Sequence, residues 1–192
     1  MGSTDYACDD NGIALITINN PSRKNAMTYS MIEQMYHHLT VAGNEARVVI
    51  LTGAEDAFCA GIDLNFLSDI PPEERGIKVP THDENGLWNI TACPIPVIAA
   101  VNGPAVGMGA EWTSHCDIRI ASRNSRFSWN LSHRGLIADT GAGTWLLPRQ
   151  IGIQQALRLL YSGEWLDAQR AYETVSYTHL RAHETREDLV CR

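Results

Sequence analysis

The segment Val97–Glu111, VIAAVNGPAVGMGAE, decides the fold that the sequence predicts. Its apolar run Val97–Val101 indicates a buried strand, and the Asn-Gly-Pro break at 102–104 indicates a turn. The glycine-rich residues 107–109 then lead into a helix over Ala110–His115. The first amides of a helix lack partners and lie at the positive end of its dipole, so this turn is suited to hold a developing negative charge. The alternative interpretation is that the strand, turn and helix form a packing motif without a role in binding.

Strands and helices alternate on both sides of this segment. The predicted strands are Tyr6–Cys8, Ile13–Ile18, Val48–Thr52, Val97–Val101 and Asp117–Ala121. The predicted helices are Tyr29–Asn44 with Thr28 as its N-cap, Gly141–Leu147, Gln154–Tyr161 and Asp167–Tyr172. This order predicts an α/β fold with right-handed crossovers, and Ser122–Thr140 reads as a long connection. A thioester or phosphate ligand would lie at the carboxyl ends of the strands.

Composition sets the class of protein. The chain has 192 residues, 44% hydrophobic and 19% charged, which predicts one folded domain of ordinary size. A net charge of −7 argues against a nucleic-acid surface, and no apolar run is long enough to span a membrane. Five scattered cysteines without a CxxC pair suit a reducing, cytoplasmic location and argue against a metal site.

Three blocks of the sequence, in the same order, carry a family resemblance. The blocks are Ala57–Leu64 (AFCAGIDL), Ala100–Ile118 (AVNGPAVGMGAEWTSHCDI) and Gly135–Gly152 (GLIADTGAGTWLLPRQIG). They resemble the enoyl-CoA hydratase/isomerase, or crotonase, superfamily. The resemblance implies a ClpP/crotonase-like spiral of β-β-α repeats and an acyl-CoA thioester substrate. It also implies no metal or redox cofactor beyond the coenzyme A of the substrate, and a homotrimer or hexamer.

The resemblance places an oxyanion hole on the backbone amides of Ile62 and Met108. Two amides aimed at a thioester oxygen would stabilise the enolate that forms when a proton leaves the neighbouring carbon, and losing one donor costs roughly 3 kcal/mol of barrier. Arg23 and Lys24 are the nearest cations for the CoA phosphates, with a solvated surface pair as the alternative. The remaining substrate contacts are assigned to Ala26, Ala60, Gly61, Asp63, Leu64, Gly107 and Leu131.

The sequence departs from the hydratase pattern at one carboxylate. Hydratases of this family place a water with two glutamates, of which the first matches Glu111 and the second falls on Leu131. Asp139 matches a working aspartate of some isomerase-type members. Each acid also has a structural alternative, because Asp139 could cap the helix near Gly141 and Glu111 could pair with a cation.

These observations predict a crotonase-like core over residues 1–173, with the usual C-terminal helical domain truncated. Residues 174–192 are polar and aperiodic, and we interpret them as a non-native or disordered tail, with a diverged native tail as the alternative. The leading functional hypothesis is double-bond isomerisation of an enoyl-CoA by Asp139 and Glu111. Hydration by Glu111 is one alternative, and an inert fragment that binds acyl-CoA or a partner is another.

Overall fold

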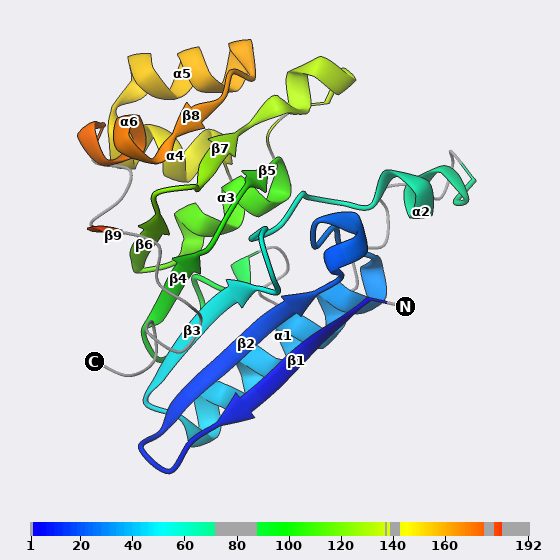
Figure 1. Ribbon diagram of the computed structural model, residues 1–192, viewed down its shortest axis with the longest axis vertical. Coiled ribbons are helices and arrows are strands. Elements are labelled where there is room, and N and C mark those ends of the chain that lie inside the picture. Colours follow the sequence, from blue (N-terminus) through cyan, green and yellow to red (C-terminus); the bar gives the residue numbers. More distant parts are fainter. Residues whose placement is uncertain (1, 72–87, 137, 139–142, 175–178, 182–192) are drawn as a thin grey trace.

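A computed structural model describes residues 2–71, 88–136, 138, 143–174 and 179–181 of the chain (Figure 1). Its main sheet has six strands in the order β1-β2-β3-β4-β6-β9. These strands are β1 (Ser3–Cys8), β2 (Ile13–Asn19), β3 (Val48–Gly53), β4 (Val97–Val101), β6 (Ile118–Ser122) and β9 (His179–Arg181). β1 and β2 form an antiparallel hairpin, and every later pairing is parallel. The predicted α/β class and parallel sheet are therefore confirmed.

The central strands of the main sheet are apolar, and alternate residues along them are buried. Val97, Ala99, Ala100 and Val101 of β4 are all at most 3% exposed, whereas Ile98 is half-buried. The hydroxyl of Thr52 on β3 donates to the carbonyl of Ala100 at 2.8 Å, which satisfies the polar group inside this core.

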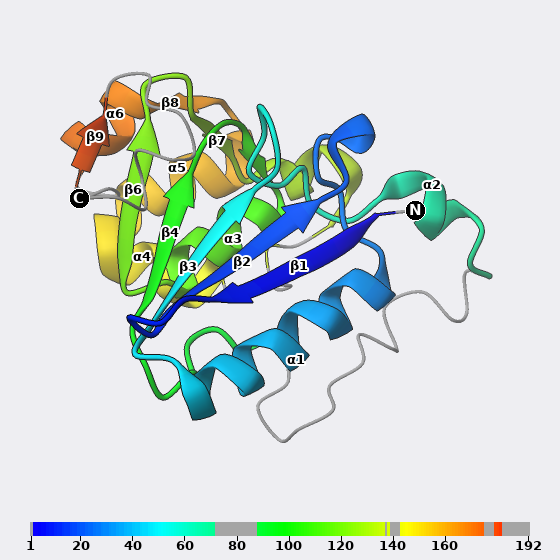
Figure 2. The ribbon, with the colours of Figure 1, turned by 60° about the horizontal axis from the view of Figure 1, so that its bottom comes forward.

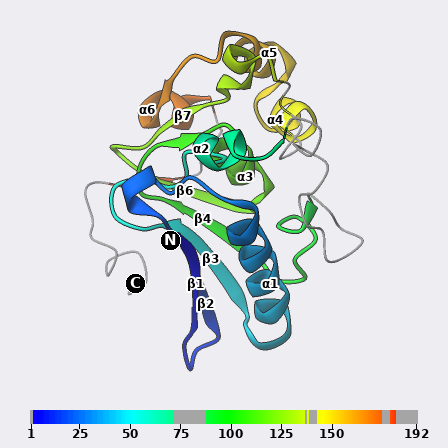
Figure 3. The same cartoon turned by 90° about the vertical axis from the view of Figure 1, so that its right-hand side faces the viewer.

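Helix α1 (Tyr29–Glu45) lies along one face of the main sheet (Figures 2 and 3). The hydroxyl of Thr28 accepts from the Met31 amide at 3.4 Å, so the predicted N-cap is confirmed. The side chains that α1 buries against the sheet share a helical spacing; they are Met31, Ile32, Met35, Tyr36, Leu39 and Ala42.

The connection predicted over Ser122–Thr140 is wrong in part, because it contains two regular elements. These are the strand β7 (Arg126–Ser128) and the 3-10 helix η4 (Asn130–Arg134). β7 pairs with β5 (Ala105–Val106) and with β8 (Leu166–Asp167) in a second, three-stranded sheet. Strands of two or three residues have no detectable period, and their partners are distant in sequence, so a local pattern could not reveal them.

The remaining helices gather beside this small sheet (Figure 1). They are α3 (Met108–His115), α4 (Gly143–Ile151), α5 (Ile153–Ser162) and α6 (Ala168–Glu173), with the short α2 (Leu64–Ser68) and the 3-10 helix η1 (Pro21–Arg23) elsewhere. α4 continues past its predicted end at Leu147, through Pro148. In the part of the chain that the structure describes, none of these helices is both long enough and apolar enough to cross a bilayer.

Only four residues of the predicted tail, 174 and 179–181, are among those described. The backbone of β9 pairs with β6, with Ala121 opposite Leu180. The predicted boundary at residue 173 and the nature of the tail therefore stay predictions.

Candidate active site

The orientation of the Ile62 amide is set by a parallel β-bridge between Ile62 and Met27, which follows the loop at residues 20–25. The Met27 amide donates to the Gly61 carbonyl, and the Asp63 amide donates to the Met27 carbonyl, both at 2.8 Å. Because alternate residues of an extended segment point their backbone groups to opposite sides, the Ile62 N–H points away from Met27. Among the described residues no acceptor receives this N–H.

The Met108 amide lies at the first position of α3. The preceding Gly107 amide donates to the Ser128 carbonyl of β7 at 2.8 Å, and the Glu111 amide donates back to the Gly107 carbonyl at 3.0 Å. Gly107 has φ +54° and ψ −123°, a conformation that favours glycine, and it turns the chain from β5 into the helix. No described acceptor takes the Met108 N–H, as expected for the first residue of a helix.

The turns that carry the two amides pack directly against each other. A Cβ placed on Gly61 would lie 3.6 Å from the Met108 nitrogen and 3.0 Å from the Val106 carbonyl oxygen. On the other turn, Gly109 is so close to Cys59 that a Cβ there would lie 2.8 Å from the Cys59 Cβ. Two amides without a described acceptor thus lie on adjoining backbone turns, which is one of the conditions for an oxyanion hole.

Glu111 is one turn beyond Met108 on α3 and is fully buried. A Cβ on Gly143, the first residue of α4, would lie 2.5 Å from the Glu111 Oε1 atom. Leu131, where hydratases are expected to hold the second glutamate, is a buried residue of η4 at 7% exposure. Asp139 lies outside the described residues. Its neighbour Ala138 is buried, and the Ala138 carbonyl accepts from the Thr144 amide at 3.2 Å.

The two cations of the early loop are held by carboxylates. Arg23 forms an ion pair with Asp63 at 3.0 Å, and Lys24 forms one with Asp56 at 2.6 Å. Asp63 also caps α2, because its Oδ1 atom accepts from the Asn65 amide at 2.9 Å. The hydrogen bond from Arg23 is the main reason that the pKa of Asp63 lies below its ordinary value. Arg23 and Lys24 remain partly exposed, so their predicted contact with CoA phosphates stays a prediction.

The other predicted contacts line the same loops. Ala26 is buried, Ala60 is half-buried, and Leu64 is an exposed first residue of α2. The sequence analysis missed Asn25, whose buried side chain donates to the carbonyls of Ala54 at 2.8 Å and Ala57 at 2.7 Å. The signal in the sequence was an asparagine within a polar loop, a residue type that tolerates the left-handed conformation found here, φ +58°.

The fold is of the crotonase type, and comparison with known proteins agrees. The family described as Enoyl-CoA hydratase/isomerase matches residues 9–174. The chain belongs to the enoyl-CoA hydratase/isomerase family.

Relatives with different named activities match to a similar degree. A "Probable enoyl-CoA hydratase" of Rhodobacter capsulatus is 37% identical over 83% of this chain and 62% of its own length. The ethylmalonyl-CoA decarboxylase of Homo sapiens is 36% identical over 88% of this chain and 56% of its own length. The 1,2-epoxyphenylacetyl-CoA isomerase of Escherichia coli is 37% identical over 85% of this chain and 64% of its own length.

A solved enoyl-CoA hydratase/isomerase from Pseudoalteromonas atlantica superposes with a TM-score of 0.84 at 32% identity, over 94% of this chain and 70% of that one. This likeness confirms the crotonase-like fold. The chain spans about six-tenths of the length of the three curated relatives above, at 62%, 56% and 64%.

Proposed function

We propose that the chain binds an acyl-CoA thioester with its carbonyl oxygen on the Ile62 and Met108 amides, and that it moves a double bond within an enoyl-CoA. The observation that carries the choice of reaction is Leu131, a buried leucine where a hydratase is expected to hold its second glutamate. Two unpaired amides on adjoining turns support the binding mode.

In this mechanism the backbone stabilises charge and the carboxylates move a proton. A base removes a proton beside the thioester or further along the acyl chain, and electron density moves onto the thioester oxygen. The two amides hold that oxygen as a dienolate forms. The proton then returns to a different carbon, which shifts the double bond. We assign the proton transfer to Asp139, with Glu111 positioning or assisting it.

Isomerisation asks less of this site than hydration does. Addition of water requires a placed water and a group that activates it, and the resemblance assigns both tasks to paired glutamates. With Leu131 in the second position, Glu111 is the carboxylate of that pair that this chain retains. A leucine can neither hold a water by a charged hydrogen bond nor accept its proton.

Hydration by Glu111 is the second candidate, and two observations favour it. Glu111 is fully buried one turn from the Met108 amide, and a relative that is 37% identical is named as a hydratase. Loss of CO₂ from a malonyl-type thioester, the reaction in the name of the human relative, also leaves its charge on the thioester oxygen. The amide pair therefore supports acyl-CoA chemistry in general, and the side chains select the reaction.

The test compares two substrates and three variants. Wild-type chain is assayed with 3-enoyl-CoA and 2-enoyl-CoA side by side, together with Asp139→Ala, Leu131→Glu and the matched control Leu131→Gln. We expect double-bond movement to exceed hydration in the wild type, and Asp139→Ala to lower its rate by roughly two to four orders of magnitude. Leu131→Glu, but not Leu131→Gln, should raise hydration relative to isomerisation.

Three results would contradict this proposal. Dominant hydration by the wild type, or an Asp139→Ala variant as active as the wild type, would return the main role to Glu111. Tight binding of acyl-CoA without turnover of either substrate would favour the inert acyl-CoA-binding alternative.

A further inference from the structure

Cys59 occupies the junction between the two turns that carry the proposed oxyanion amides. Its backbone amide donates to the Pro104 carbonyl at 3.2 Å, and its carbonyl accepts from the Val106 amide at 2.9 Å. These bonds join the segment before Ile62 to β5, which leads into Met108. The close approach of Gly109 to Cys59 adds a contact with the first turn of α3.

The side chain of Cys59 makes a separate contact with the backbone that leads to Ile62. Its Sγ atom accepts a hydrogen bond from the Gly61 amide at 3.4 Å inside the protein. Gly61 has φ +87°, a conformation that only glycine adopts at low cost. The Gly61 carbonyl is held by the Met27 amide, and the Gly61 amide is held by the Cys59 thiol.

We infer that Cys59 is a positioning residue for the proposed reaction, which this inference takes as given: its thiol fixes the turn at Gly61 and so aims the Ile62 N–H at the thioester oxygen. The same side chain sets the distance between that turn and the first turn of α3. Cys59 itself has no role in bond making or breaking.

The environment of the thiol fits this role and excludes a nucleophilic one. Cys59 is 0% exposed, and burial raises the pKa of its thiol to about 12. A neutral thiol is a poor nucleophile at neutral pH, because the thiolate is the reactive form. Its sulfur can still accept a weak hydrogen bond from a buried amide.

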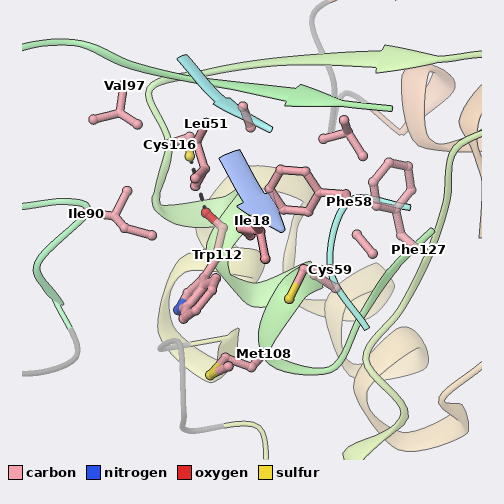
Figure 4. Close-up of a cluster of buried hydrophobic side chains, with 14 of the residues drawn as sticks. Ile18, Leu51, Phe58, Cys59, Ile90, Val97, Met108, Trp112, Cys116 and Phe127 are labelled. Carbon is pink, nitrogen blue, oxygen red and sulfur yellow. Dashed lines mark hydrogen bonds between the residues drawn. The ribbon is translucent and has the colours of Figure 1, made fainter. Parts of the chain in front are cut away.

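Cys116 provides a matched control at the other end of α3. It is 2% exposed, burial likewise raises the pKa of its thiol to about 12, and its Sγ atom contacts the Trp112 carbonyl at 3.4 Å. Figure 4 shows both thiols in one buried cluster, Cys59 near Met108 and Cys116 near Val97 and Leu51. Replacing either thiol by Ala removes the same atoms from the same kind of environment, but only Cys59 contacts the Ile62 turn.

The experiment measures turnover and backbone amide exchange in Cys59→Ala, Cys59→Ser and Cys116→Ala. Removing an oxyanion donor costs about 10²–10³ in kcat, so a donor that remains but is less well aimed should cost about tenfold. We expect Cys59→Ala to lower kcat about tenfold with KM changed less than about twofold. Cys59→Ser, whose hydroxyl can accept from the Gly61 amide, should recover part of that loss. Amide exchange at Gly61 should accelerate about tenfold in Cys59→Ala and stay unchanged in Cys116→Ala.

The two readouts separate this inference from the proposed function. A wild type without enoyl-CoA turnover refutes the proposed function, and the exchange rate at Gly61 then decides alone whether Cys59 holds the turn. An active wild type with Gly61 exchange unchanged in Cys59→Ala overturns the inference. Equal kcat values for Cys59→Ala and Cys116→Ala overturn it as well, because the loss would then reflect a buried thiol in general.

Discussion

Replacing Gly109 by Ala should separate the two proposed oxyanion amides. The new Cβ would lie 2.8 Å from the Cys59 Cβ and 2.9 Å from the Cys59 carbonyl carbon, and nearer still to the Cys59 carbonyl oxygen. Carbon atoms prefer about 3.5–4.0 Å, so the first turn of α3 must retreat by about 1 Å. A misplacement of about 1 Å can lower a rate by about 10²-fold, and we expect a loss of that size in kcat.

The substitution should also destabilise the chain, because the new Cβ meets backbone atoms of Cys59. Overpacking lowers the free energy of unfolding by about 1–3 kcal/mol, and the higher helix propensity of Ala raises it by about 1 kcal/mol. A net loss of about 1 kcal/mol lowers the Tm of a chain of this size by about 2–4 °C.

The control is Gly43→Ala in the last turn of α1, where the new Cβ would lie 3.0 Å from the ring of Pro94, an exposed residue that can yield. Gly43→Ala should leave kcat unchanged and Tm unchanged or higher, as measured by enoyl-CoA turnover and thermal unfolding monitored by circular dichroism. A Gly109→Ala variant with wild-type kcat would refute the reasoning, because the amides would then tolerate the displacement.

Two further perturbations test the surroundings of the site. Asp63→Asn should destabilise the chain most at pH above about 4. The hydrogen bond from Arg23 lowers the pKa of Asp63 below its ordinary value of 3.8. The ionised Asp63 carboxylate therefore stabilises the folded chain above that ordinary value, and this stabilisation is lost as the pH falls through the folded-state pKa. Thermal unfolding from about pH 3 to 7 checks this, and a Tm difference that is independent of pH would argue against the ion pair. Gly143→Ala should lower kcat at least about tenfold, because its Cβ would lie 2.5 Å from the Glu111 Oε1 atom and displace the carboxylate. Wild-type turnover in Gly143→Ala would show that the position of Glu111 does not matter for the reaction.

Much of the fold was predictable because its central strands are short, continuous apolar runs. The predicted strands Val48–Thr52 and Val97–Val101 match β3 and β4 within one residue, since continuous apolar runs bounded by Gly and Pro leave few alternatives. The Thr28 cap marked the start of α1 correctly for a local reason, an N-cap hydroxyl. The small sheet of β5, β7 and β8 was not predictable, because its pairs join residues such as Phe127 and Leu166 that are far apart in the chain.

At the candidate site too, the sequence indicates local turns, whereas contacts between distant residues appear only in the structure. Glycines at 107 and 109 indicated a tight turn, but only the structure shows that Gly61 and Gly109 face the partner turn. The ion pair between Arg23 and Asp63 joins residues 40 positions apart, so spacing could not reveal that the expected phosphate-binding cation already has a carboxylate partner.

In the proposed binding mode, the Ile62 and Met108 amides share one thioester oxygen. The most direct test is a crystal structure of the chain with an unreactive, saturated acyl-CoA, in which the distances from the thioester oxygen to the two amide nitrogens are measured. We expect both distances to lie at about 2.7–3.1 Å, the range for an oxyanion-hole donor. A thioester oxygen more than about 4 Å from either nitrogen, with the acyl-CoA bound, would contradict it.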